Sequence, residues 1–451
     1  MPSADKSAAD TIAAIATAPG RGGIGVVRVS GKNLAAMAQA LTEKNLQARV
    51  ATFTSFYSAD KRVLDQGLAL FFPAPHSFTG EDVLELQGHG GNAVLQLILQ
   101  RCLELGARIA QPGEFTRRAF LSDKLDLLQA ESVADLIEAS TAEAAQSAMR
   151  SLSGEFSQQI YTLVAGLTHL RALVEATLDF PEEEIDFIQT TDAANRLKQL
   201  RSQLNVLLTN AKQGQLLREG LQVVLIGQPN VGKSSLMNKL AGEEVSIVTP
   251  VAGTTRDTVK NMIIIKGIAI HVIDTAGLRE SDEEVEKIGI ARTYAAMEKA
   301  SVVLVVRDAT QPEQAYEEVI RKKLPASLPV VYVHNKIDLA QRAAKIEQRA
   351  DGAHIYLSAK SGAGVGLLHQ HLLQLAGWHN TGEGIYMARR RHTTALEQAA
   401  AHLTTAQSQL SKPELFAEEL RLAQTRLSDI TGEFSADDLL GEIFSRFCIG
   451  K

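Results

Sequence analysis

A phosphate-binding loop begins at Gly227 and reads Gly-Gln-Pro-Asn-Val-Gly-Lys-Ser as far as Ser234. The loop directly follows the apolar run 223–226, so the pattern predicts a strand that turns into a helix at the loop. In such a loop the backbone N–H groups close on the β-phosphate, Lys233 brings a positive charge to the β- and γ-phosphate oxygens, and Ser234 ligates Mg²⁺. This loop alone does not distinguish ATP from GTP.

The base is selected by a second segment, which reads Asn-Lys-Ile-Asp at 335–338 and follows the apolar run 330–333. A carboxylate at Asp338 accepts hydrogen bonds from the N1–H and the exocyclic amine of guanine, and adenine offers neither donor. Ser-Ala-Lys at 358–360, after the predicted strand 354–357, completes the base pocket. The sequence therefore predicts a guanine nucleotide site.

Two further segments are predicted to meet the γ-phosphate and its metal ion. Thr255 lies in Gly-Thr-Thr-Arg-Asp and reaches the metal, while Asp274 in Asp-Thr-Ala-Gly holds Mg²⁺ through water and Gly277 offers its N–H. The order and spacing of the motifs resemble those of translation-factor-related GTPases. The residues predicted to contact the nucleotide are Asn230, Val231, Gly232, Lys233, Ser234, Ser235, Thr249, Thr254, Thr255, Asp274, Thr275, Ala276, Gly277, Asn335, Lys336, Asp338, Ser358, Ala359 and Lys360.

Each motif has an ordinary alternative when it is taken alone. A Gly-rich loop string arises by chance, Asn-Lys-x-Asp is often a helix cap or a turn, and Ser-Ala-Lys is too short to be specific. The motifs occur here in a fixed order, and the phosphate loop and both base-binding segments follow apolar runs. The combination favours the nucleotide interpretation over all three alternatives.

Composition sets bounds on the class of protein. A chain of 451 residues is too long for one core and suggests about three domains. The two cysteines, Cys102 and Cys448, show no metal-ligand spacing and indicate a reducing cytosol. No apolar run reaches the ~20 residues that span a bilayer, so we expect a soluble cytoplasmic protein with no membrane contact. The net charge of −6 argues against an extensive non-specific nucleic-acid surface.

The hydrophobic pattern changes along the chain and predicts an α/β plus all-α fold. Strands are expected at 11–17, 25–29, 67–72 and 82–86, with a helix at 93–105, whereas Leu163, Leu167, Leu170 and Val174 recur at helical spacing. The simplest account is a helical domain interrupted by a Ras-like P-loop GTPase domain with a mostly parallel sheet. The expected divisions are an N-terminal α/β domain (1–119), a helical domain (120–218 and 381–451) and the GTPase domain (219–380).

Four further segments carry a resemblance that covers essentially the whole chain. They are Ala-Pro-Gly-Arg-Gly-Gly-Ile-Gly-Val-Val-Arg-Val-Ser-Gly (18–31), Glu-Leu-Gln-Gly-His-Gly-Gly (85–91), Pro-Gly-Glu-Phe-Thr-Arg-Arg-Ala-Phe-Leu-Ser-Asp-Lys-Leu-Asp-Leu (112–127) and the terminal Phe-Cys-Ile-Gly-Lys (447–451). With the phosphate loop, they resemble the MnmE (TrmE) family of tRNA wobble-uridine modification GTPases.

The resemblance implies a homodimer formed through the N-terminal domains, which bind 5-formyl-tetrahydrofolate or a related one-carbon folate. It also implies a heterotetramer with the flavoprotein MnmG. Together they would add a carboxymethylaminomethyl or aminomethyl group to carbon 5 of the wobble uridine of certain tRNAs. A binding module, an RNA- or ribosome-associated GTPase switch whose N-terminal domain is only a scaffold, remains the alternative.

Hydrolysis needs a group that positions the attacking water, and the usual glutamine is missing. Leu278 stands where Ras-like enzymes carry that glutamine. The acidic run 280–286 offers candidates, and the resemblance selects Glu286, acting through water. The alternative is that these acids form a solvated surface.

No arginine finger is evident in the sequence, and the resemblance implies that potassium supplies its charge. Asn230 would give its side-chain oxygen and the loop 249–254 its carbonyl oxygens. The alternatives are that Asn230 caps the loop backbone, and that Arg256 or Arg279 donates charge rather than pairing on the surface. The predicted metal ligands are Ser234 and Thr255 for magnesium and Asn230, Thr249, Val251 and Thr254 for potassium.

The resemblance places the C-terminal tail near the folate pocket. Arg28, Glu85, Lys124 and Lys451 are then the candidates for the polar groups of the cofactor, although Arg28 and Glu85 alone are typical of exposed strand charges. Cys448 is a candidate catalytic residue; a buried inert thiol is the alternative, and Lys451 as the last residue argues against prenylation.

Overall fold

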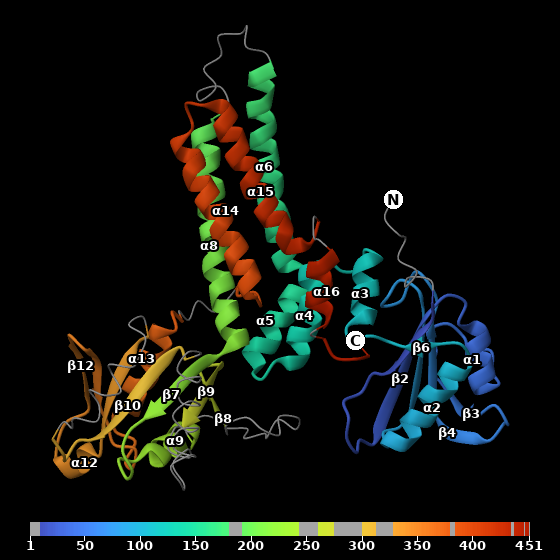
Figure 1. The fold of residues 1–451 in the computed structure, drawn as a ribbon, viewed down its shortest axis with the longest axis horizontal. Coiled ribbons are helices and arrows are strands. Elements are labelled where there is room, and N and C mark those ends of the chain that lie inside the picture. The colour runs from blue at the N-terminus through green and yellow to red at the C-terminus, as the bar shows by residue number, and fades with distance from the viewer. Residues whose placement is uncertain are drawn as a thin grey trace, which may run out of the picture. The chain divides into compact units, whose positions relative to one another are not determined.

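The computed structural model describes residues 10–179, 192–242, 260–274, 300–312, 328–378, 384–433, 437–445 and 447–450 (Figure 1). The chain forms two compact units. The first unit comprises 1–137, 151–203 and 395–451, and the second comprises 138–150 and 204–394. The division into three domains that we expect from the sequence, with the helical domain in two segments, stays a prediction. None of the described helices combines the length and the apolar character that crossing a membrane requires.

The first unit contains a six-stranded sheet in the order β3-β4-β5-β2-β1-β6, antiparallel except for the β1–β6 pair. Its strands are β1 Ile12–Ile15, β2 Ile24–Gly31, β3 Thr52–Tyr57, β4 Val63–Phe72, β5 Asp82–His89 and β6 Arg108–Ile109. The four strands and the helix predicted here are confirmed, the helix as α2 Asn92–Glu104. Strand β3 and helix α1, Ala35–Thr42, were not predicted.

The two faces of this sheet are covered by different elements. Side chains alternate along β2, so Val27 and Val29 are buried in a core with the α2 residues Leu95 and Ile98. On the opposite face, helix α3, Glu114–Leu121, packs Phe115 against Ile12 and Ala14 of β1. Arg28 lies between Val27 and Val29 in β2 and therefore belongs to the face covered by α3.

The helical part of the first unit is held by apolar contacts between sequence-distant helices. Helix α6, Glu155–Asp179, packs against α15, Pro413–Thr431, and the four predicted positions at helical spacing are all buried. Helix α16, Asp437–Ser445, buries Phe444 in a cluster with Leu127 of α4, Leu127–Glu138. Phe447, just after α16, belongs to the same cluster. The long helices α8, Ala193–Glu219, and α14, Arg390–Ser408, each contribute residues to both units.

The second unit is built on a seven-stranded sheet in the order β12-β13-β11-β10-β7-β9-β8. Its strands are β7 Leu221–Ile226, β8 Lys260–Ile265, β9 Ile268–Asp274, β10 Val302–Asp308, β11 Val330–Asn335, β12 Lys345–Arg349 and β13 Gly352–Tyr356. All pairings are parallel except those of the edge strands β8 and β12. The predicted, mostly parallel sheet is thus confirmed. The described helices that lie wholly within this unit are α9 Lys233–Gly242, α12 Ile337–Ala340 and α13 Val365–Leu375, and α5 Ala142–Leu152 lies in it up to residue 150.

Candidate nucleotide and cofactor sites

The phosphate loop connects β7 to α9, as its motif predicts. The backbone turns at Gly232, whose φ of +94° falls in the left-handed region. A Cβ atom at this position would lie 2.3 Å from Nδ2 of Asn335. Glycine is therefore required at position 232 both by the backbone angle and by the side chain that packs against it.

Asn335 joins the three motifs of the predicted site. Its Nδ2 donates a hydrogen bond to the carbonyl oxygen of Val231 at 2.9 Å, and its Oδ1 accepts one from the N–H of Ala359 at 2.9 Å. The residue is 2% exposed, so both hydrogen bonds are shielded from water. The base-selecting segment, the phosphate loop and the Ser-Ala-Lys loop therefore meet at one side chain.

The neighbouring Lys336 makes a second link to the phosphate loop. Its Nζ donates to the carbonyl oxygen of Asn230 at 2.7 Å and forms an ion pair with Oδ2 of Asp308 at 2.8 Å. Burial favours the neutral acid, but hydrogen bonds from Lys336 and Thr310 hold the pKa of Asp308 below its usual value. Sequence analysis missed Asp308, although it ends β10 at the carboxyl edge where parallel strands collect polar groups.

The remaining phosphate-loop residues lie at the beginning of α9. Lys233 is 6% exposed, and its Nζ donates to the carbonyl oxygens of Gly227 and Gln228, both at 2.8 Å. Ser234 and Ser235 are exposed at the same end of the helix. A buried ammonium group beside an exposed hydroxyl fits the predicted division between phosphate binding and magnesium binding.

The other predicted contacts are divided between described and undescribed residues. Asp338 is exposed in the first turn of α12, and Ser358 is buried after β13 with Lys360 exposed beside it. The backbone of Asp274 ends β9 opposite Leu225 of β7. The predicted residues that lie outside the described ones are Thr249, Val251, Thr254, Thr255, Thr275, Ala276, Gly277, Glu286 and Lys451, with the alternatives Arg256 and Arg279.

Asn230 has the properties of an available oxygen ligand. Its φ is +66° and its side chain is exposed. Within the described part of the chain its side-chain amide makes no hydrogen bond, whereas its backbone oxygen accepts from Lys336. The carbonyl oxygen of such an amide fits a hard monovalent cation, so the donor chemistry suits potassium.

In the first unit, Arg28 and Glu85 form one of the predicted cofactor-binding groups. They face each other in register across β2 and β5, and Nη2 of Arg28 lies 2.9 Å from Oε1 of Glu85. The guanidinium carbon also lies 5.7 Å from the ring centre of Phe78 and 5.9 Å from that of Phe115. The side chains of Arg28 and Glu85 are 24% and 17% exposed, so neither is an ordinary strand-surface charge.

The C-terminal tail contacts the beginning of α3. The N–H of Gly113, the N-terminal cap of this helix, donates to the carbonyl oxygen of Cys448 at 3.3 Å. Gly113 has a φ of +66°, and a Cβ atom there would lie 2.7 Å from the carbonyl oxygen of Phe444. Cys448 is exposed whereas Phe447 is buried, so the structure does not show the buried thiol given as an alternative.

Lys124 lies beyond the other end of α3. Its N–H donates to the carbonyl oxygen of Ala119, and its Cε lies 3.5 Å from the position of a Cβ atom built on Gly80. The candidate cofactor residues are therefore distributed along α3, from the tail at its beginning to Lys124 past its end. Phe78, Phe115 and the residues that hold them were missed, because no local pattern connects them to Arg28.

A parallel sheet with a phosphate loop, to which an Asn-Lys-x-Asp segment is bound, defines a P-loop guanine-nucleotide-binding protein. Comparison with protein families gives the same class. The family "MnmE helical domain" matches residues 127–448, and "GTP-binding protein TrmE N-terminus" matches residues 11–124.

Relatives are similar to this chain over almost its whole length. The tRNA modification GTPase MnmE of Chromobacterium violaceum is 58% identical, covering 98% of both chains. That of Nitrosomonas europaea is 59% identical, covering 98% of this chain and 99% of the relative, and that of Thiobacillus denitrificans is 60% identical over 98% of each. The chain belongs to the MnmE family of tRNA modification GTPases.

Solved structures give weaker matches. The G domain of the Thermotoga maritima FeoB iron transporter is 28% identical, covering 35% of this chain and 98% of that one, with a TM-score of 0.27. Aquifex aeolicus Era bound to GDP·AlF4⁻ is 27% identical, covering 40% and 66%, also with a TM-score of 0.27. At these TM-scores neither match adds to the assignment.

Proposed function

We propose that this protein is a potassium-stimulated GTP hydrolase that works with the flavoprotein MnmG on tRNA. Together they add a carboxymethylaminomethyl or aminomethyl group to carbon 5 of the wobble uridine. The protein acts in the cytoplasm as a homodimer that joins MnmG in a heterotetramer. The name carried by relatives that are 58–60% identical over 98% of the chain supports the proposal.

Binding of GTP uses the motifs that meet at Asn335. Asp338 accepts the guanine N1–H and amine, and Lys233 moves from the loop carbonyl oxygens to the phosphate oxygens. Ser234 and Thr255 would hold magnesium, which would supply positive charge to the phosphate oxygens. The observation that carries the nucleotide assignment is the pair of hydrogen bonds that Asn335 makes, donating to the Val231 carbonyl oxygen and accepting from the Ala359 N–H.

Hydrolysis requires a positioned water and a positive charge at the leaving oxygen. Glu286 orients the attacking water through a second water molecule. It takes the role of the glutamine that Ras-like enzymes carry where this chain has Leu278. Asn230 and the carbonyl oxygens of 249–254 would hold potassium, which would supply the positive charge that an arginine finger provides elsewhere.

The cofactor site of the first unit binds a one-carbon folate. Arg28, Glu85 and Lys124 meet the polar groups of the folate, together with Lys451. The ring of Phe78 supports this role, because it lies near Arg28 and is exposed, and a flat pterin ring stacks on aromatic side chains. Phe115 is buried beneath Arg28 and supports the guanidinium from within the protein. Cys448 is exposed beside α3 and is the candidate for a covalent step.

The proposal is tested by analysing the nucleosides of tRNA from a deletion strain. We expect the modified wobble uridine to disappear and to return when the gene is restored, but not when an Asp338→Asn variant is restored. Unchanged nucleosides in the deletion strain would contradict the enzymatic role and favour the RNA-associated switch.

Potassium dependence is tested on the purified protein. We expect hydrolysis to be about a hundredfold faster in potassium than in sodium, because sodium is too small for the same set of oxygen ligands. The Asn230→Ala variant should be slow in both salts. Equal wild-type rates at matched ionic strength would remove potassium from the proposal.

A further inference from the structure

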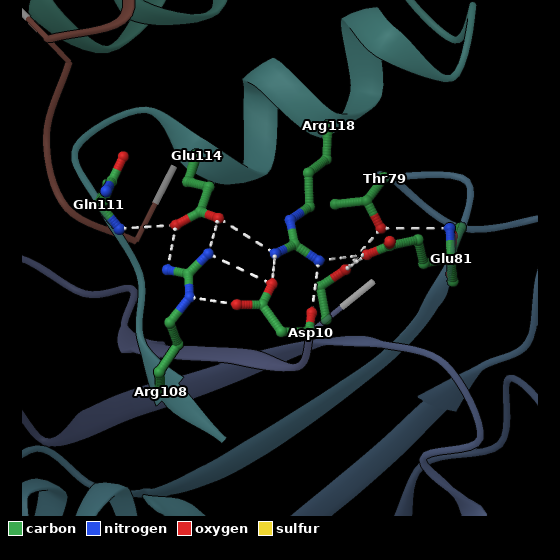
Figure 2. Close-up of polar contacts among 9 residues, drawn as sticks. Asp10, Thr79, Glu81, Arg108, Gln111, Glu114 and Arg118 are labelled. Atoms are coloured by element: carbon green, nitrogen blue, oxygen red, sulfur yellow. Dashed lines mark hydrogen bonds and ion pairs between the residues drawn. The ribbon is translucent and has the colours of Figure 1, made fainter. Parts of the chain in front are cut away.

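Arg118 of α3 lies at the centre of a charged network that the proposed function does not use (Figure 2). Its Nη1 lies 3.0 Å from Oε2 of Glu81, and its Nη2 lies 3.0 Å from Oε1 of Glu114 and 2.9 Å from Oδ1 of Asp10. Nη1 also donates to the carbonyl oxygen of Asp10 at 2.8 Å. The Arg118 side chain is only 6% exposed, so these charge-assisted hydrogen bonds are largely shielded from solvent.

Through Glu81 this network reaches the loop that precedes β5. Oε2 of Glu81 accepts a hydrogen bond from Ser30 Oγ at 2.9 Å, and Ser30 Oγ lies 2.7 Å from Oγ1 of Thr79. Ser30 lies two residues after Arg28 in β2, so both side chains belong to the same sheet face. Arg118 therefore connects α3 to a loop that lies against the Arg28 face.

Both segments that Arg118 connects contribute a ring to the surroundings of Arg28. Phe78 precedes the Thr79–Glu81 contacts in the loop, and Phe115 follows Glu114 in α3. These two rings lie within about 6 Å of the Arg28 guanidinium carbon, the range in which a cation is attracted to a ring face. Their separation depends on how α3 and the loop are held together.

We propose that Arg118 is a positioning residue for the cofactor site, which sets the spacing of Phe78 and Phe115 around Arg28. This inference rests on the proposed folate site and adds the element that keeps the exposed ring of Phe78 at a fixed distance from Arg28 and from the buried ring of Phe115. Glu81 is the link between Arg118 and the loop. A pterin ring binds beside Arg28 more tightly when this spacing is already set in the free protein. A preorganised pocket loses less conformational entropy on binding than a pocket that must first become ordered.

Arg108 provides a matched control within the same network. Its guanidinium pairs with Glu114 at 2.6 Å and with Asp10 at 2.5 Å. The carboxylates of Glu114 and Asp10 that Arg118 binds are thus also bound by Arg108. Among the described residues, Arg108 contacts neither Glu81 nor the carbonyl oxygen of Asp10. Loss of Arg108 weakens the network without releasing the loop.

The experiment compares Arg118→Gln with Arg108→Gln in the full-length protein. Calorimetry with 5-formyl-tetrahydrofolate measures affinity, and hydrogen–deuterium exchange measures the protection of peptides that cover residues 74–82. We expect Arg118→Gln to weaken folate binding about tenfold, which is ~1.4 kcal/mol, and to speed exchange in this loop. Arg108→Gln should change folate affinity less than about twofold and leave loop exchange unchanged.

Three outcomes would overturn the proposal: equal loss of affinity in both variants, unchanged loop exchange in Arg118→Gln, or unchanged affinity in it. If Arg118→Gln does not fold, Glu81→Gln replaces it, because this substitution removes the carboxylate charge and keeps a hydrogen-bond partner for Ser30. Glu81→Gln should speed exchange in the loop as Arg118→Gln is expected to do, with a smaller loss of folate affinity. Wild-type protein that binds no folate would refute the proposed cofactor site instead. The exchange data would still show whether Arg118 holds the loop in place.

Discussion

The nucleotide site and the proposed cofactor site are each stabilised by a different kind of contact. In the second unit, Asn335 and Lys336 bind backbone atoms of the phosphate loop and of the Ser-Ala-Lys loop. In the first unit, Arg28 and Arg118 bind carboxylates of residues that lie 57 and 37 positions away. A backbone partner is present whatever the neighbouring side chains are, whereas a side-chain network needs every partner in place. We therefore expect a substitution in one site to reduce ligand binding at that site and to leave the other site unchanged.

The largest effect is expected when the backbone contact itself is blocked. Gly232→Ala places a Cβ atom 2.3 Å from Asn335 Nδ2 and forces a residue with a side chain to a φ of +94°. A displaced buried hydrogen bond and a strained backbone each cost ~1–3 kcal/mol, so nucleotide affinity should fall about a thousandfold. Titration with a fluorescent GDP analogue measures this.

Gly366→Ala is the control, because a Cβ atom at that helical position meets nothing within 4 Å. It should leave nucleotide affinity unchanged. Normal nucleotide affinity in Gly232→Ala would show that nucleotide binding does not need the contact between Asn335 and the phosphate loop. The nucleotide site would then not depend on backbone contacts in the way proposed above.

The next effect separates turnover from binding within the nucleotide site. Glu286→Ala should slow GTP hydrolysis about a hundredfold with nucleotide affinity nearly unchanged, because a group that orients water acts only in the transition state. Single-turnover hydrolysis and nucleotide titration on one preparation measure the two quantities. A parallel fall in affinity and rate would mean that Glu286 is structural.

A smaller effect tests whether the cofactor site fails alone. Deleting residues 448–451 removes the acceptor of the Gly113 N–H and the contact of Gly450 with the end of β1. Folate affinity should fall about tenfold and tRNA modification should be lost, while GTP hydrolysis persists. Calorimetry and a GTPase assay on the truncated protein provide the test. Loss of both activities together would show that the two sites are not independent.

The smallest effect is expected for Asp308→Asn. Lys336 keeps its hydrogen bond to Asn230 and loses only the ion pair, so nucleotide affinity should fall about threefold at neutral pH. Because the pKa of Asp308 is lowered in the folded protein, the wild-type ion pair stabilises the site above the unfolded pKa and is lost as the pH falls. The two proteins should therefore become alike in acid. A difference that persists at low pH would contradict this role.

Much of the framework could be predicted from local patterns. The four strands and α2 of the first sheet, and β7, β11 and β13 of the second, all contain apolar runs or alternation. Strand β3 was missed because Thr54 is buried while Phe53 is exposed, so its buried face does not appear in the sequence as an alternation of apolar and polar residues. Strand β12 was missed because it is a charged edge strand, and the eight-residue α1 is too short to show a clear period.

The sequence by itself determined the nucleotide chemistry, because a phosphate loop and a base-selecting segment act largely through their own contiguous backbone and side chains. Only the tertiary structure decided which charges are paired. Arg28 meets Glu85 because β2 and β5 pair in one register, and Arg118 meets Glu81 because α3 packs beside the loop that precedes β5. Hydrogen bonds act over about 3 Å and depend on direction, so a small change in strand register or helix position would select different partners.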